Sequence, residues 1–139
     1  MAQTVKDVMT RNPRLLKASE TIVDAARVMR DENIGTVIVT QGDRIRGIVT
    51  DRDIVVRAIA DGANPSSTQL GDIVSDHVET VTPDTDIDDA IEIMRMRAIR
   101  RLPVVDSGRP VGIVSIGDLA IERDRSSALA DISAAQPNT

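Results

Sequence analysis

Two segments of the chain carry apolar residues at the spacing of one helix face. The apolar positions follow i, i+3, i+4 and i+7 in both: Ile22, Ala25, Ala26 and Met29, then Ile87, Ala90, Ile91 and Met94. A polar residue precedes each run, with an acid three positions later: Thr21 with Asp24, and Asp86 with Asp89. An oxygen acceptor at the N-cap and a carboxylate at N3 are typical of helix starts. The pattern predicts two amphipathic helices beginning near residues 22 and 87.

Each predicted helix is followed by two short apolar runs joined by turn formers. The runs are 36–40 and 46–50, joined through Gln41-Gly42-Asp43, and then 102–105 and 111–115, joined through Ser107-Gly108. Helical turns at 5–9 and 70–74, extended pieces near 15–16 and 80–81, and helices beginning near Asp51 and Gly117 complete the pattern. This order of strand, helix, strand, strand and helix, present twice, predicts a mixed α/β (α+β) fold.

The two sets of elements are copies of one another at a constant offset. Asp7 corresponds to Asp72, Gly47-Ile48-Val49-Thr50 to Gly112-Ile113-Val114-Ser115, and Asp53 to Asp118, with no gap needed. Only two copies are present, so one compact module is expected and not a stacked array of repeats. We assign residues 5–61 to the first repeat, 62–69 to a linker, 70–125 to the second repeat and 126–139 to a flexible C-terminal tail.

Composition narrows the class of protein. The 139 residues are 41% hydrophobic and 28% charged, without a membrane-length apolar run or a signal-peptide core, which favours a cytoplasmic protein with no membrane partner. The chain has no cysteine, which excludes disulfides and thiolate metal sites. The net charge of −5 and the absence of Phe, Tyr and Trp argue against nucleic-acid binding, which relies on basic surfaces and aromatic stacking.

The sequence contains few of the motifs and residue types that catalysis and metal binding require. The sequence has no phosphate-binding Gly-x-x-x-x-Gly-Lys loop, no Gly-x-Ser-x-Gly and no His-Glu-x-x-His. His77 is the single histidine, and a zinc site wants about four ligands, so we interpret His77 as a surface-loop residue. We therefore predict neither enzymatic activity nor a metal site.

Four motifs carry a resemblance to a known family. They are Val5-Lys6-Asp7-Val8-Met9, Gly47-Ile48-Val49-Thr50-Asp51-Arg52-Asp53-Ile54, Arg100-Arg101-Leu102-Pro103-Val104-Val105-Asp106 and Gly112-Ile113-Val114-Ser115-Ile116-Gly117-Asp118-Leu119. In this order the chain resembles the cystathionine β-synthase (CBS) domain family in its tandem, stand-alone form, the Bateman module. The resemblance implies two pseudo-symmetric β-α-β-β-α repeats packed through their sheets, and regulatory binding of adenosyl compounds.

The resemblance also implies a ligand-binding pair in each repeat. Family members use a Thr or Ser three residues before an Asp to hold the ribose and phosphate, which here are Thr50 with Asp53 and Ser115 with Asp118. The chemistry is suitable, because a carboxylate can accept both hydroxyls of a ribose diol, and a hydroxyl with free N–H groups at a helix start suits a phosphate. The same spacing is also that of a helix-capping box, and the two roles can coexist.

Basic residues distinguish the two repeats. Family members often place a basic residue just before the strand predicted at 102–105, facing the phosphates; Arg100 and Arg101 stand there, and the first repeat has Gly35 and Thr36. Arg52 is a second candidate, replaced by Gly117 in the second repeat. The alternative for the arginines is an ordinary solvated surface. The predicted ligand-binding set is Thr36, Thr50, Arg52, Asp53, Arg100, Arg101, Pro103, Ser115 and Asp118.

These features favour a regulatory sensor without a tightly bound cofactor. It would bind AMP, ADP, ATP or S-adenosylmethionine in clefts between paired repeats and signal occupancy to an effector protein that the sequence does not identify. The alternative is a dimeric structural or stress-related adaptor whose clefts are empty or vestigial. We also expect a disk-like homodimer, because the helix faces of Ile22, Ala25, Ala26 and Met29 and their counterparts supply more apolar surface than one small sheet can cover.

Overall fold

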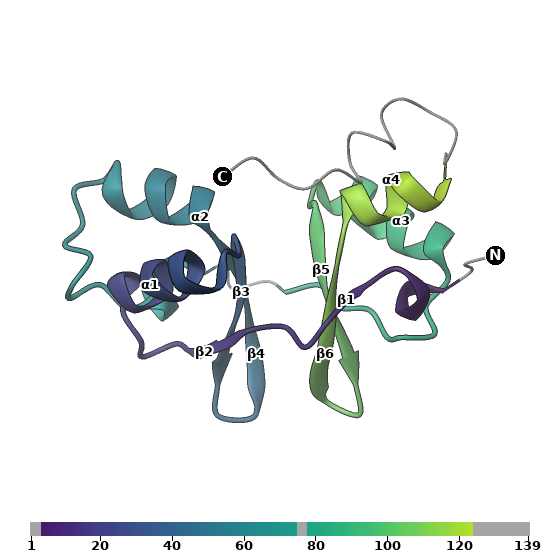
Figure 1. Ribbon diagram of the computed structural model, residues 1–139, viewed down its shortest axis with the longest axis horizontal. Coiled ribbons are helices and arrows are strands. Elements are labelled where there is room, and N and C mark those ends of the chain that lie inside the picture. The colour runs from purple at the N-terminus through teal and green to yellow at the C-terminus, as the bar shows by residue number, and fades with distance from the viewer. Residues whose placement is uncertain (1–3, 75–77, 124–139) are drawn as a thin grey trace. The chain divides into compact units, whose positions relative to one another are not determined.

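The computed structural model describes residues 4–74 and 78–123. The chain divides into two compact units (Figure 1). One consists of residues Pro13–Val78, and the other combines Met1–Asn12 with Glu79–Thr139. We call them the first and the second unit after the repeat that supplies most of each, and we describe each by itself.

The first unit is a three-stranded mixed sheet with its helices. Its elements are β2 (Leu15–Lys17), α1 (Ile22–Glu32), β3 (Thr36–Gln41), β4 (Arg44–Thr50), α2 (Asp51–Asp53), the π-helix η2 (Ile54–Ile59) and the 3-10 helix η3 (Leu70–Asp72). The strand order is β2-β3-β4, with β2 parallel to β3 and β3 antiparallel to β4.

The second unit repeats the hairpin and its helices with a different third strand. Its elements are the 3-10 helix η1 (Val5–Asp7), β1 (Thr10–Arg11), α3 (Ile87–Arg97), β5 (Arg101–Asp106), β6 (Arg109–Ser115) and α4 (Ile116–Arg123). The strand order is β1-β6-β5, and both pairings are antiparallel. The extended piece expected near residue 81 is reduced to a single parallel bridge between Val81 and Val104.

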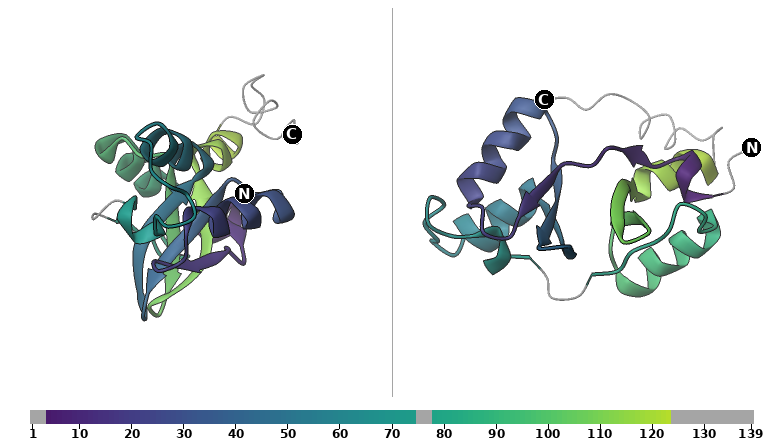
Figure 2. Two further views of the ribbon diagram at one scale, coloured as in Figure 1. Left: turned by 90° about the vertical axis from the view of Figure 1, so that its left-hand side faces the viewer. Right: turned by 90° about the horizontal axis from the view of Figure 1, so that it is seen from below.

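In each unit the helices cover one face of the sheet (Figure 2). The first core contains Val37, Val39 and Val49 of the sheet packed with residues of α1 and of the helix after β4. The second contains their counterparts Leu102, Val104 and Val114. This arrangement confirms the predicted mixed α+β fold, whereas the packing of the repeats through their sheets stays a prediction.

The two hairpins agree in loop length and in the place of their bulge and differ in turn conformation. Each has a two-residue turn, with positive φ at Gly42 in the first and at both Ser107 and Gly108 in the second. Positive φ at both turn residues is what a type I′ hairpin turn requires. Each hairpin also contains a bulge at the same place, between Val39 and Thr40 and between Val104 and Val105. The predicted turns are confirmed, except that Gln41 belongs to the strand.

The starts of the two long helices differ. At α1, Thr21 and Asp24 form the predicted capping box: Asp24 N donates to Thr21 Oγ1 at 3.2 Å, and Thr21 N donates to Asp24 Oδ2 at 2.9 Å. At α3, Asp86 occupies the N-cap position but makes no side-chain capping hydrogen bond. The expected Asp86–Asp89 cap is therefore wrong, since the correct residue types alone do not form the contact.

The helix after β4 begins at Asp51 as predicted but widens after one turn. Residues 54–59 are a π-helix, in which Ala60 N donates to Val55 O. Wide turns of this kind are rare and are not encoded by the apolar spacing from which the helix was predicted.

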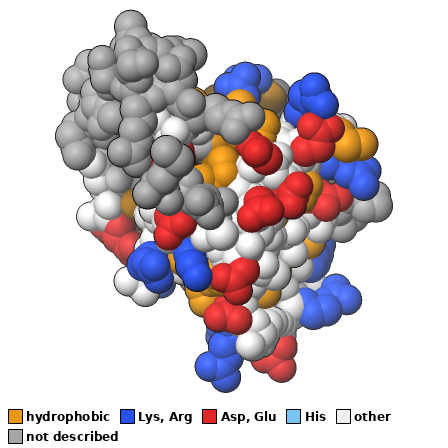
Figure 3. Space-filling view, turned by 90° about the vertical axis from the view of Figure 1, so that its right-hand side faces the viewer, with side chains coloured by type: hydrophobic (Ala, Val, Ile, Leu, Met, Phe, Trp, Pro, Cys, Tyr) orange, Lys and Arg blue, Asp and Glu red, His pale blue; other side chains and the backbone are white. Residues whose placement is uncertain are grey.

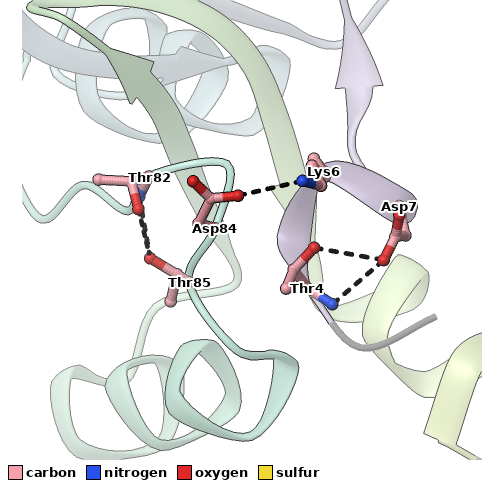
Figure 4. A network of polar contacts seen from close by, with 6 residues as sticks. All are labelled: Thr4, Lys6, Asp7, Thr82, Asp84 and Thr85. Atoms are coloured by element: carbon pink, nitrogen blue, oxygen red, sulfur yellow. Dashed lines mark hydrogen bonds and ion pairs between the residues drawn. The ribbon is translucent and has the colours of Figure 1, made fainter.

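The leading segments of the two repeats are exchanged between the units. Val5, at the start of the first repeat, is fully buried in the second unit's core, and Leu70, at the start of the second repeat, is fully buried in the first unit's core. Figure 4 shows part of the first exchange, where Lys6 Nζ contacts Asp84 Oδ1 at 3.1 Å. The backbone also contributes, since Val5 N donates to Thr85 O at 2.9 Å. Compact units and sequence repeats therefore have different boundaries.

The apolar face of α1 is used inside its own unit. Ile22, Ala25 and Met29 are buried in the first core, and of the four residues of this face only Ala26 is exposed. The sequence predicts a homodimer on the argument that this face exceeds what one sheet can cover. That argument is wrong, because the unit's own sheet covers the face. The predicted C-terminal tail lies outside the described residues.

Candidate functional site

Both predicted ligand pairs form the same reciprocal contact at the turn from strand to helix. Thr50 N donates to Asp53 Oδ2 at 2.9 Å, and Asp53 N donates to Thr50 Oγ1 at 3.1 Å. Ser115 N donates to Asp118 Oδ2 at 2.9 Å, and Asp118 N donates to Ser115 Oγ at 3.1 Å. The structure thus brings each pair together as a capping box, the alternative role that the spacing allowed.

Capping uses only half of each carboxylate. The contacts engage Oδ2 of Asp53 and of Asp118 and leave Oδ1 of each outside the cap. Asp53 Oδ1 lies 3.9 Å from Arg57 Nε, whereas Asp118 Oδ1 has no partner among the residues that the structure describes. A carboxylate held at one oxygen by a backbone N–H can still accept from a ligand hydroxyl at its other oxygen.

Strand register adds a third residue to each turn. Thr36 at the start of β3 pairs with Thr50 at the end of β4, and Arg101 at the start of β5 pairs with Ser115 at the end of β6. Directly opposed residues place their side chains on the same face of a sheet, about 5 Å apart at Cβ. The predicted pairs and the predicted strand-start residues therefore lie together in each unit.

A backbone hydrogen bond closes each turn and fixes the residue before the strand. Asp51 N donates to Gly35 O at 3.0 Å, and Ile116 N donates to Arg100 O at 2.8 Å. A Cβ placed on Gly35 would lie 3.2 Å from Asp51 Oδ2, so a carboxylate occupies the space beside this glycine. At the equivalent positions the second unit has Arg100 and Ile116, and Ile116 is exposed.

The two remaining predicted residues, Pro103 and Arg52, differ in burial. Pro103 lies within β5 opposite Ile113 and is fully buried, and its carbonyl accepts from Val81 N at 3.1 Å. Arg52 is exposed in the first turn of α2, and its backbone N donates to Asp51 Oδ1 at 2.9 Å. Arg52 is thus near the pair of Thr50 and Asp53, whereas Pro103 packs inside the second unit.

Sequence reasoning passed over Arg57. It extends from η2 toward Asp53 and donates from Nη1 to Ile73 O at 3.1 Å. The equivalent residue of the second repeat is Glu122. The reversed charge at equivalent positions four residues after the aspartates was the signal available in the sequence.

The first unit also contains an open surface hollow of about 400 Å³. It is lined by residues of β2, the β3–β4 hairpin and η3, among them Lys17, Thr40, Arg46 and Asp72. None of the predicted ligand-binding residues lines this hollow. It lies beside the hairpin turn, at the opposite end of β4 from Thr50.

Charged side chains of both signs are exposed on the surface. Figure 3 shows acidic and basic side chains interspersed over the face that it draws. Within residues 4–74 and 78–123, no group of three or more His, Asp or Glu side chains is placed to hold a metal ion. His77 lies outside the described residues. No helix in the described part of the chain is long and apolar enough to cross a membrane.

Comparison with known proteins identifies the repeats. The family model for the CBS domain matches residues 5–59 and 70–124. The CBS domain-containing protein YhcV of Bacillus subtilis is 36% identical over 134 residues, covering 94% of this chain and 95% of that protein. Hypoxic response protein 1 of Mycobacterium tuberculosis is 34% identical over 118 residues, covering 84% of this chain and 82% of that protein.

Solved structures of the same fold differ in what they hold. The CBS domain pair of protein MJ0100, solved with 5′-methylthioadenosine and S-adenosyl-L-methionine, has a TM-score of 0.77 at 26% identity and covers 89% of this chain and 98% of its own. Hypoxic Response Protein I, solved with two coordinated zinc ions, has a TM-score of 0.76 at 32% identity, with 88% and 99% covered. A hexameric CBS-CP12 protein from bloom-forming cyanobacteria has a TM-score of 0.78 at 25% identity, with 100% and 78% covered. The chain belongs to the CBS domain family, as a tandem pair of these domains.

Proposed function

We propose that this CBS domain pair is a non-catalytic regulatory module that binds an adenosyl ligand at its strand-to-helix turns and reports occupancy to a partner protein. The observation that carries the proposal is the reciprocal pair of Ser115 and Asp118, which leaves Asp118 Oδ1 unpartnered among the described residues. Such an oxygen suits a ribose diol, which offers two adjacent hydroxyl donors. The MJ0100 domain pair, which binds adenosyl compounds on the same fold, supports this ligand class.

The aspartates provide the test, because capping and ligand contact predict different losses. Asp118→Ala at an occupied turn should remove two hydrogen bonds to the ribose, which weakens binding by about 2–4 kcal/mol, or about thirty- to a thousand-fold. A purely capping role would lower folding stability by about 1 kcal/mol and leave affinity nearly unchanged. Asp53→Ala tests the first repeat in the same way. Affinity for AMP, ATP and S-adenosylmethionine is measured by calorimetry, since the chain has no aromatic fluorophore.

Asp24→Ala is a matched control for this experiment. Asp24 makes the same reciprocal cap with Thr21 at the start of α1 and has no predicted ligand role. It should lower the thermal midpoint without changing affinity. If Asp53→Ala and Asp118→Ala behave like Asp24→Ala, the ligand role is wrong; if the unaltered chain binds no adenosyl compound, the structural or stress-related adaptor is the better account.

We further propose that two copies of the chain associate through the helix that follows β4. Val55, Val56 and Ile59 are 59%, 48% and 48% exposed, and all three lie on η2. Three large aliphatic side chains gathered on one element are a better interface candidate than scattered exposed residues. The hexameric CBS-CP12 neighbour supports assembly in this fold.

Sedimentation of Val56→Glu/Ile59→Glu tests the association. The unaltered chain should sediment as a dimer at tens of micromolar, and the double variant should sediment as a 15.0 kDa monomer with its fold retained. A monomer in both cases would contradict the proposal.

A further inference from the structure

We propose that the surface hollow of the first unit binds a small anion, one that carries a phosphate or a carboxylate group. The hollow lies beside the hairpin turn, at the opposite end of β4 from Thr50, so it is separate from the strand-to-helix turn of that unit. Its volume of about 400 Å³ lies within the range of small-molecule pockets. All the residues that line it belong to the first unit.

Two cations from different strands line the hollow. Lys17 is exposed on β2, and its ammonium has no hydrogen bond or ion pair among the residues that the structure describes. Arg46 is half-buried on β4, where Nη1 donates to Gln41 Oε1 at 2.6 Å and Nη2 donates to Gly71 O at 3.5 Å. These bonds hold the guanidinium between the hairpin turn and η3. An ammonium and a guanidinium are the side-chain groups that bind phosphates and carboxylates.

One carboxylate also lines the hollow, but it is partly occupied by the backbone. Asp72 Oδ2 accepts from Gln69 N at 3.1 Å, at the start of η3. Lys17 and Arg46 together outweigh Asp72, so the lining has one net positive charge. Ser19 adds an exposed hydroxyl that has no partner in the described part of the chain and can donate to a ligand. Two cations and a hydroxyl donor favour an anion over a cation.

The second unit shows how protein side chains use the equivalent place. The backbone makes the same contact in both units. Gly71 N donates to Ala18 O at 2.9 Å in the first. Lys6 N donates to Pro83 O at 3.0 Å in the second. On this shared backbone the Lys6 ammonium contacts Asp84 Oδ1 at 3.1 Å (Figure 4). A cation and an anion of the chain itself therefore pair at the place that corresponds to the hollow.

The first repeat lacks both members of this ion pair. Gly71 stands at the position of Lys6, and Ser19 stands at the position of Asp84. Gly71 packs closely, because a Cβ placed on it would lie 3.2 Å from Ala18 Cβ. The two small residues leave open the place that the ion pair takes in the second unit.

The first repeat gains two cations where the second repeat has neutral residues. Lys17 stands at the position of Thr82, and Arg46 stands at the position of Val111. The hollow therefore has cations and has no carboxylate at the position of Asp84. The phosphate or carboxylate of a ligand would supply this missing anion, with charge-assisted hydrogen bonds from the two cations.

Titration with inorganic phosphate and with succinate tests the two anion chemistries. Gly42 and Gly71 line the hollow, so their amide resonances in ¹⁵N-labelled protein are the reporters. We expect at least one of the two anions to shift both resonances saturably, with a dissociation constant of about 1 mM. Sodium chloride at matched ionic strength should not reproduce the shift, because screening acts on all exposed charges and does not saturate at one site.

Exchanging the cations tests their role. Lys17→Thr/Arg46→Val, the exchange variant, introduces the residues of the second repeat and should weaken anion binding about tenfold. Arg27→Gln/Arg30→Gln is the α1 control, because it removes the same charge from the first unit outside the hollow. It should leave the affinity within about twofold.

Filling the hollow tests its shape without a change of net charge. Gly71→Lys/Ser19→Asp, the filled variant, introduces the ion pair of the second unit and should abolish the saturable shift at Gly42. A Cβ at Gly71 is a close fit, so Ser19→Asp alone is the second variant, and its carboxylate should also weaken anion binding. The thermal midpoint shows whether each variant is folded.

Each outcome decides the proposal. Saturable binding that the exchange variant weakens, and that the filled variant or Ser19→Asp reduces, supports it, and the tighter of the two probes identifies the anionic group. Three results overturn it: no shift with either probe, a shift that sodium chloride reproduces, or a loss of binding as large in the α1 control. Phosphate shifts confined to the amides of Asp53 and Asp118 also overturn it, because those amides belong to the strand-to-helix turns.

Discussion

The strand-to-helix turns of the two repeats share a backbone and differ in almost every exposed side chain. Each has a reciprocal cap, a backbone bond that closes the turn, and a strand partner opposite the capping hydroxyl. Around this common frame, Gly35 and Asp51 of the first repeat correspond to Arg100 and Ile116 of the second. The residues that the repeats share therefore build the turn, and the residues in which they differ give the two turns different charges.

The same comparison distinguishes repeats from folding units. Sequence similarity joins Val5 to the first repeat and Leu70 to the second, but each side chain is buried in the core of the other repeat's unit. Similarity thus shows which segments are copies of one another, and burial shows which residues stabilise one another.

The largest expected effect is on these exchanged segments. Leu70→Ala should lower the free energy of unfolding by about 3 kcal/mol and Val5→Ala by about 1–2 kcal/mol, because each leaves a cavity in a packed core. Hydrogen exchange should show Leu70→Ala loosening α1 and β3, and Val5→Ala loosening α3 and β5. If each variant instead loosened the unit named after its own repeat, the burial of these leading segments in the other repeat's unit would be contradicted.

A smaller effect is expected at the capping hydroxyls. Thr50→Ala and Ser115→Ala should each lower stability by about 1 kcal/mol, because both hydroxyls accept from the backbone at N3 with the same 3.1 Å geometry. Denaturant titration measures stability, and calorimetry with AMP measures binding. A ligand role would add a loss of AMP affinity to this loss of stability, whereas a loss of stability alone would show that the hydroxyls only cap the helices.

The smallest effect is on pH dependence at the helix starts. The backbone N–H of Thr21, and next its hydroxyl, hold the pKa of Asp24 below its ordinary value by hydrogen bonding to the ionised carboxylate. A depressed pKa in the folded state gives stability that is present above the ordinary value for Asp and is lost as pH falls through the depressed one. The protection of the Thr21 amide, measured as its exchange rate relative to that of an unprotected amide at the same pH, should therefore fall on acidification in this range.

The start of α3 is the internal comparison for this pH effect. Asp86 makes no side-chain capping hydrogen bond, so amides there should show no matching change from loss of a cap. Asp24→Asn should flatten the response at Thr21. A response that survives in Asp24→Asn would mean that another group titrates.

Much of the fold could be predicted because it is encoded within a few neighbouring residues. The helix starting at Ile22 follows from its capping box and apolar spacing, and the turn at Ser107-Gly108 follows from the residues that tolerate positive φ. The capping boxes of Thr50 with Asp53 and of Ser115 with Asp118 follow from the same local spacing, since each pair is three residues apart, whereas their ligand role was implied by the family resemblance.

The sequence by itself determined the repeat, its helices and turns, and the capped aspartates, because each depends on contacts between near neighbours. Tertiary structure alone decided that Val5 and Leu70 pack in exchanged units, that the apolar face of α1 is covered by its own sheet, and that Arg101 stands opposite Ser115. The physical reason is that strand pairing and core packing join residues far apart in the chain, where apolar spacing specifies burial but not the partner.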